Sequence, residues 1–111
     1  MSMPKEWPIL EADDFCRGTY EMGDQRCLIG WWTHAGGVWG DSRFYALCAS
    51  TSKQLGAVAV GDNYRFPPAI NDHAGNPKSL LARIWNRVGA KLGYRVGNPE
   101  CTRSGKLRPV K

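Results

Sequence analysis

Residues 76–93 read NPKSLLARIWNRVGAKLG and carry the clearest secondary-structure signal in this chain of 111 residues. Five apolar side chains recur there at helical spacing and form one face: Leu81, Ile84, Trp85, Val88 and Leu92. Asn76 is expected as the N-cap, Pro77 as the first helical residue and Gly93 as the left-handed stop. The sequence therefore predicts a helix from about Lys78 to Leu92 whose apolar face packs on the core.

A second face of the same helix is cationic. Arg83, Arg87 and Lys91 recur every fourth residue, so they should line up along one side, and no acidic residue within the helix neutralises them. The chain after Gly93 is rich in Arg, Lys, Gly and Pro, which favours an exposed, irregular or flexible tail over about residues 97–111. This tail is expected to extend the basic surface.

Charge is unevenly distributed along the chain. Up to Gly75 there are six basic residues against nine acidic ones, a balance of −3, and from Asn76 onward there are nine basic residues against Glu100 alone, a balance of +8. The two sum to the net charge of +5. Such polarity creates a one-sided field that attracts polyanions or an acidic protein face.

The length fits one domain over residues 1–111, with about 1–8 and 97–111 as the segments expected to be flexible. Five Trp, four Tyr and three Phe can close a small core.

The segments upstream of the basic helix predict a mainly α fold, a small helical bundle with irregular loops. The expected pieces are an irregular helix over Pro8 to Arg17, a helix from an N-cap at Asp24 to Gly36, a helix over Ser42 to Ala49, a loop at Tyr64 to Pro68, and a helical turn over Ala69 to His73. Leu55 to Val60 fits a strand or a buried helical turn equally well.

Several short motifs occur in a recognisable order: Cys16-Arg17-Gly18-Thr19-Tyr20, Arg26-Cys27-Leu28-Ile29-Gly30 followed by Ala35-Gly36, and Ile70-Asn71-Asp72 before the amphipathic helix. This order resembles a family of small uncharacterised proteins of phages and other mobile elements. Its members carry a Gln-Gly segment, a Cys-x-x-Gly-Ala helix and a Trp-Asn-Asp turn before a C-terminal helix. Over about residues 15–92, this chain differs in having Arg17 for Gln, Trp31 for the small residue after Gly30, and Ile70 for Trp. The resemblance implies a compact, mainly helical accessory protein of a mobile genome, and it brings no catalytic residue with it.

The chain has no apolar run near the roughly 20 residues that a membrane span needs, and Met1 to Leu10 is too polar for a signal peptide. We therefore expect a cytoplasmic protein, in the host cytoplasm if phage-encoded, with no membrane partner. Cys16, Cys27, Cys48 and Cys101 form no Cys-x-x-Cys pair, so free, mostly buried thiols are expected rather than a zinc site or another cofactor.

An enzymatic alternative uses Cys27 as a nucleophile near a helix start, with His73 as its base, in a hydrolase of faintly papain-like layout. A buried structural thiol is the competing interpretation. Asp13, Asp14 and Asp72 are expected in surface or capping roles, because adjacent acids on a helix point in different directions.

The composition favours a non-enzymatic binding protein whose basic C-terminal helix and tail engage an anionic partner. The expected binding residues are Arg83, Arg87, Lys91, Arg95, Arg103, Lys106 and Arg108, with Tyr64 and Arg65 nearby to stack on bases or nucleotides. The partner is either a nucleic acid or nucleotide, or an acidic face of a host protein or nucleoprotein complex, as for an inhibitor of host defence. In the second case, exposed Trp7 or Trp39 would serve as interface anchors.

Overall fold

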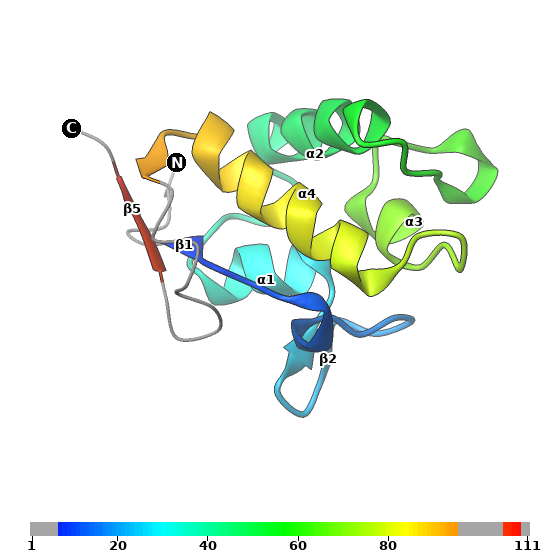
Figure 1. Ribbon diagram of the computed structural model, residues 1–111, viewed down its shortest axis with the longest axis horizontal. Helices are drawn as coiled ribbons and strands as arrows, with labels where there is room; N and C mark the ends of the chain where they lie inside the picture. Colours follow the sequence, from blue (N-terminus) through cyan, green and yellow to red (C-terminus); the bar gives the residue numbers. More distant parts are fainter. Residues whose placement is uncertain (1–6, 96–105, 110–111) are drawn as a thin grey trace.

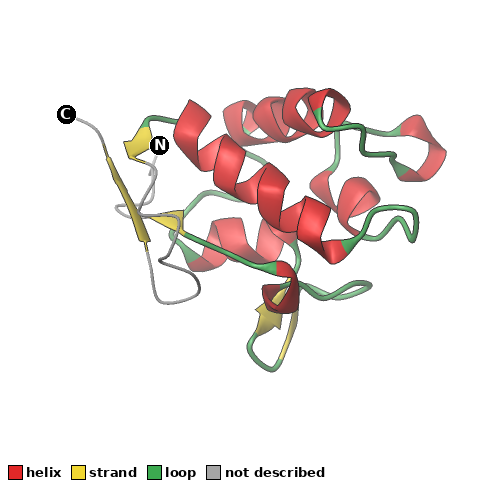
Figure 2. Cartoon of the chain, in the orientation of Figure 1, coloured by secondary structure: helices red, strands yellow, loops and turns green. Residues whose placement is uncertain are grey.

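The computed structural model describes residues 7–95 and 106–109. Within these ranges, four α-helices account for most of the regular structure: α1 (Leu28–His34), α2 (Ser42–Gln54), α3 (Pro67–Asn71) and α4 (Lys78–Lys91). Two 3-10 helices, η1 (Ala12–Asp14) and η2 (Val60–Asp62), lie in the connections. The strands are β1 (Trp7–Pro8), β2 (Glu21–Met22), β3 (Gln25–Arg26), β4 (Tyr94–Arg95) and β5 (Lys106–Pro109). Helices predominate in the described ranges, in agreement with the expected mainly α class. The expected helical bundle is not confirmed, because the helices are accompanied by two small sheets that were not predicted (Figures 1 and 2).

Helix α4 crosses the front of the molecule and packs on α2 and η1, while α1 and α3 pack on each other (Figure 1). Strands β1, β5 and β4 form an antiparallel sheet near the C-terminal end of α4, and β2 pairs with β3 in a separate hairpin (Figure 1). No helix in the described ranges is long and apolar enough to cross a bilayer.

The core is built around stacked aromatic rings. Trp7 stacks on Trp85 with ring centroids 4.1 Å apart, and Trp32 stacks on Phe44 at 4.3 Å. All four rings are fully buried. A Cβ at Gly89 would lie 2.4 Å from the Trp7 ring, so only glycine lets α4 approach it this closely. Aromatic pairs of this kind supply much of the buried area in so small a domain.

The burial of Trp7 corrects two expectations about the chain ends. Trp7 was expected to be exposed and its segment flexible, but it lies in β1, and Tyr94 packs on it at 5.2 Å. Lys106–Pro109 was expected to be irregular, but it forms β5, which pairs with both β1 and β4. Pairing between segments about 100 residues apart leaves no local sequence pattern. Residues 97–105, 110 and 111 of the predicted tail lie outside the described residues.

Two predicted helix caps are wrong. Helix α4 is capped at Pro77, and the buried side chain of Asn76 instead bonds the backbone of Val58 and the carbonyl oxygen of Ile70. Helix α1 is capped at Cys27 rather than at Asp24, which lies in the turn between β2 and β3. Gly93 does end α4 with a positive φ of 99°, as predicted.

The observed bounds of other elements also differ from the predicted ones. Helix α2 continues five residues past the predicted Ala49 to Gln54, and most of Pro8 to Arg17 is extended apart from the 3-10 turn η1. Leu55 to Val60 is neither strand nor buried helical turn, since it runs as a loop into η2. The predicted helical turn near Ala69 begins earlier, at Pro67, because proline suits the first turn of a helix.

Candidate anion-binding surface

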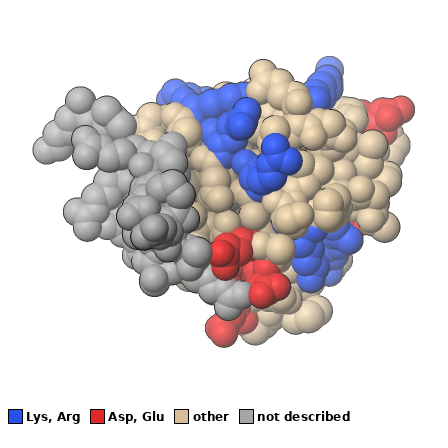
Figure 3. Space-filling model, viewed as in Figure 1, with Lys and Arg blue, Asp and Glu red and all other residues tan. Residues whose placement is uncertain are grey.

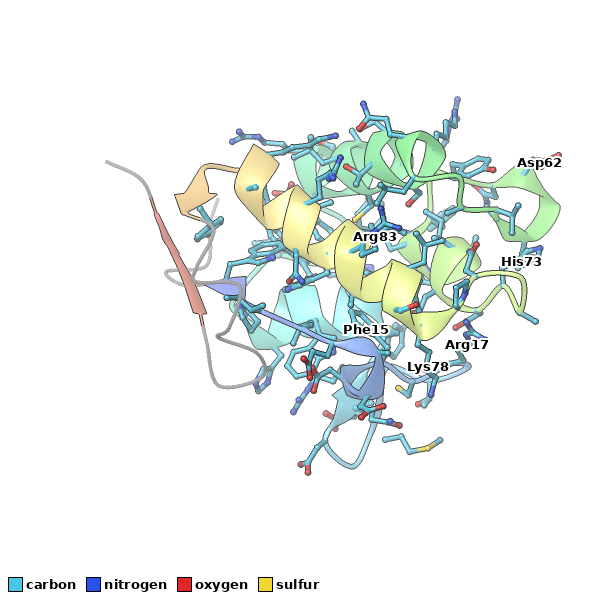
Figure 4. All side chains as sticks on the ribbon, viewed as in Figure 1. Phe15, Arg17, Asp62, His73, Lys78 and Arg83 are labelled. Carbon is cyan, nitrogen blue, oxygen red and sulfur yellow. The ribbon has the colours of Figure 1, made fainter. Side chains whose placement is uncertain are left out.

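The three cations predicted on α4 lie on its solvent side. Arg83, Arg87 and Lys91 are all exposed, and we call this set the cationic stripe. Figure 3 shows basic side chains in a band that runs from the centre of this face toward its upper left edge, while the acidic side chains of this face lie apart from that band. Figure 4 labels Arg83 at the middle of the helix. The spacing of four residues therefore does place these charges together, as predicted.

The stripe is not neutralised by carboxylates within the described ranges. The recorded ion pair there joins Arg26 Nε to Glu21 Oε2 at 3.6 Å, away from α4. Lys91 Nζ donates hydrogen bonds to Thr51 Oγ1 at 3.0 Å and to Gln54 Oε1 at 2.8 Å, both neutral groups on α2. The Lys91 ammonium is therefore held by neutral groups, and no carboxylate among the described residues cancels its charge.

The opposite face of α4 fixes its rotation. Its apolar residues are fully buried: Leu81, Ile84, Trp85 and Val88. Trp85 Nε1 donates to the carbonyl oxygen of Pro8 at 2.7 Å. The Asn86 amide bonds both the backbone nitrogen and the carbonyl oxygen of Leu10, each at 3.1 Å. These contacts fix the rotation of α4 about its axis, so the cationic stripe faces the solvent.

Of the predicted cations that follow α4 in the chain, three lie in the strands β4 and β5 and one lies outside the described residues. Arg95 lies in β4, next in the chain after the helix, and its backbone pairs with that of Arg108 in β5, where Lys106 also lies. The strands thus bring segments with three of these residues to the same end of the molecule as the C-terminus of α4 (Figure 1). Arg103 lies outside the described residues.

Tyr64 and Arg65 are not part of the stripe. The Tyr64 hydroxyl donates to the carbonyl oxygen of Ala57 at 3.0 Å, and the Lys53 ammonium lies 5.1 Å from the ring centroid. Arg65 is exposed and borders a surface hollow at the start of α2, beside Tyr45. The structure therefore places these two residues against α2 rather than α4, and Tyr64 has a structural role there.

Cys27 and His73, the alternative catalytic pair, are each engaged elsewhere. Cys27 is the N-cap of α1, its Sγ accepts a hydrogen bond from the backbone nitrogen of Gly30 at 3.3 Å, and burial raises the pKa of its thiol. His73 Nδ1 accepts from the backbone nitrogen of Gly75 at 2.9 Å. A nucleophilic cysteine needs a lowered pKa and a base within reach, so this geometry does not favour hydrolysis.

The other thiols and acids have structural surroundings. Cys16, Cys27 and Cys48 are free and buried, as predicted, and burial raises the pKa of each. Asp72 Oδ1 accepts bonds from the Gly18 backbone and the Asn71 amide. Asp14 Oδ2 accepts from the backbone nitrogen of Glu11, the N-cap of η1, at 2.8 Å. Within the described ranges, no three potential ligand side chains gather in a way that could hold a metal ion. The fourth thiol, Cys101, lies outside these ranges.

Sequence reasoning missed a second surface feature, an open groove of about 660 Å³ between the β2–β3 hairpin, α1 and the loop before α2. We call it the aromatic groove and define it by Tyr20, Glu21, Arg26, Thr33, His34 and Trp39. The exposed Trp39 was considered only as a protein anchor. Its place beside Tyr20 depends on the tertiary fold, so no motif marks it.

Comparisons with protein families, with curated proteins and with solved structures found no match to this chain.

Proposed function

We propose that this chain is a non-enzymatic binding protein, encoded by a phage or other mobile element, that engages an anionic partner through helix α4. One observation carries the proposal: Arg83, Arg87 and Lys91 are exposed along one side of a helix whose other side is buried, and none of them forms an ion pair within the described ranges. Uncompensated charge in a fixed array raises the local concentration of polyanions. The backbone of β4 and β5 places Arg95, Lys106 and Arg108 in segments beyond the C-terminal end of α4, and we include these three residues in the proposal.

Within this class, nucleic acid is favoured over an acidic protein face. Protein interfaces concentrate their binding energy in Trp, Tyr and Arg side chains, and aromatic residues and Met are enriched at their centre. The large apolar residues that are exposed in the described part of the chain lie elsewhere: Tyr20, Met22, Val38, Trp39, Val58, Val60 and Phe66. A helix that presents cations without such neighbours suits phosphates, which are held by charge and need no apolar contact.

The direct test is the salt dependence of binding to a labelled DNA duplex and to a labelled single strand, followed by fluorescence anisotropy. The proposal expects binding at low salt and a steep linear fall of log affinity with log salt concentration. Replacing Arg83, Arg87 and Lys91 together by Gln should reduce the slope by about three, because each lost phosphate contact removes close to one released counterion.

A matched control changes the net charge by the same amount away from α4. Ser42→Glu, Asn63→Asp and Ala74→Glu together add three negative charges at exposed positions and leave the stripe intact. This control should keep most of the slope. If it weakens binding as much as the Gln variant, net charge rather than the stripe is responsible. Absence of binding to either DNA at low salt, combined with nuclease-resistant capture of a host protein, would replace nucleic acid with the acidic-protein partner.

A further inference from the structure

The aromatic groove lies away from the cationic stripe and has a different chemistry. It runs between the β2–β3 hairpin and the exposed side of α1, and Trp39 lines it from the loop before α2. Tyr20 and Trp39 are 54% and 55% exposed, which is unusual for rings of this size. Their centroids are 5.3 Å apart at an interplanar angle of 81°. An edge-to-face pair leaves ring surface open to a ligand.

Polar groups line the groove beside these rings. Glu21 and Arg26 are cross-strand neighbours in the hairpin and form the 3.6 Å ion pair, with the Glu21 side chain 69% exposed and that of Arg26 only 19%. The exposed His34 imidazole stands edge-on to Trp31 at 5.6 Å, and Thr33 lies next to it. The groove thus offers a carboxylate, a guanidinium, an imidazole and a hydroxyl at the rim of an aromatic surface.

The groove is held in shape by the backbone beneath it. The Tyr20 carbonyl oxygen accepts from the backbone nitrogen of Cys27 at 3.1 Å, and a Cβ at Gly30 would lie 2.3 Å from the same oxygen. The Arg26 guanidinium lies over the Trp31 ring at 4.9 Å from its centroid. Preorganised groups of this kind reduce the entropy that a ligand must lose on binding.

From these observations we propose that the aromatic groove binds a neutral oligosaccharide. A sugar ring presents C–H groups on its faces, which pack on Tyr20 and Trp39, and hydroxyls at its edge, which bond Glu21, Arg26 and His34. The carboxylate and guanidinium cancel each other's charge, so the groove has no excess charge to attract an ionic ligand. An apolar peptide side chain would take the Glu21–Arg26 pair out of water without replacing its hydrogen bonds, whereas hydroxyls replace them.

The test uses a glycan array carrying linear neutral oligosaccharides of hexoses and N-acetylhexosamines, with calorimetric titration of the compounds that bind. Trp39→Ala should weaken binding at least about tenfold, since it removes an aromatic contact surface. Phe66→Ala is the matched control, because Phe66 is also 54% exposed but lies before α3, and it should change affinity by less than about twofold. Far-UV circular dichroism of both variants checks that they fold.

Three results would overturn the assignment. The first is a lack of binding to every neutral oligosaccharide on the array. The second is saccharide binding that Trp39→Ala leaves unchanged. The third is binding of peptides from a tryptic digest of serum albumin that depends on Trp39 while the saccharides fail, which would make the groove a peptide site.

Discussion

The cationic stripe and the aromatic groove differ in how their residues come together. The stripe is a product of one helix, since Arg83, Arg87 and Lys91 share a side of α4 through their spacing alone. The groove joins a hairpin, a short helix and a loop, so its geometry depends on contacts that hold those segments. Disturbing those contacts should therefore affect the groove first, while the stripe needs only an intact α4.

The largest effect is expected at Asn71, which is fully buried beneath the groove segments. Its Oδ1 accepts from the backbone nitrogen of Leu28 at 3.1 Å, and its Nδ2 donates to the Cys16 carbonyl oxygen at 2.8 Å. Asn71→Ala leaves both buried backbone groups without this partner and should lower the free energy of unfolding by about 3 kcal/mol. Urea denaturation measures this loss, and the exposed Asn63→Ala serves as control with a change below about 0.5 kcal/mol. A similar loss in both variants would contradict the structural role of Asn71.

A smaller effect is expected from Gly30→Ala. The added methyl would meet the Tyr20 carbonyl oxygen at 2.3 Å, so the segment that carries Tyr20, directly before β2, must move. The strain should lower the free energy of unfolding by about 2 kcal/mol, partly offset because alanine favours a helix more than glycine does. Thermal denaturation measures the loss of stability, and saccharide titration measures the effect of the displaced Tyr20 on the aromatic groove. Affinity for DNA should stay unchanged in the folded variant, and a loss of DNA binding equal to the loss of saccharide binding would break the distinction between the two surfaces.

The cationic stripe could be predicted from the sequence and the aromatic groove could not, because the stripe depends on local spacing and the groove on long-range contacts. Periodicity reports local neighbours, so the buried and cationic faces of α4 follow from the sequence. Asn76 has the side chain of an N-cap, but that side chain bonds the backbone of Val58, 18 residues earlier in the chain, and of Ile70, six residues earlier. Strand β5 pairs with β1 across about 100 residues, and Trp39 meets Tyr20 only in the folded chain. Such long-range choices leave no periodic signal.

The reactivity of two buried thiols, Cys27 and Cys48, is expected to differ by a smaller amount. Cys27 borders a small cavity beside Tyr20 and Asp72, whereas Cys48 is fully buried on α2, the helix against which α4 packs. Burial raises the pKa of both thiols, so the fraction of reactive thiolate is lower in the folded protein than in the unfolded chain. Timed iodoacetamide labelling at pH 8, read by peptide mass spectrometry, should be slower for Cys27 in the native state than in guanidinium, and slower still for Cys48.

The rate at Cys27 should rise steadily as the pH is raised, since each step toward its elevated pKa increases the thiolate. Native labelling of Cys27 faster than in guanidinium would contradict this account. Such a result would revive the alternative in which Cys27 acts as a nucleophile.

The smallest effect is expected where the two surfaces are tested against each other. The stripe and the groove share no residue and no recorded hydrogen bond within the described ranges, and separated sites contribute nearly additively. Trp39→Ala should therefore change affinity for DNA by less than about twofold, and the triple Gln variant of the stripe should change saccharide affinity equally little. Both titrations are made with each variant at one salt concentration, because DNA affinity depends steeply on salt. If Trp39→Ala weakens DNA binding as strongly as the loss of the stripe does, the two features belong to one extended surface, and Trp39 then stacks on a base rather than on a sugar ring.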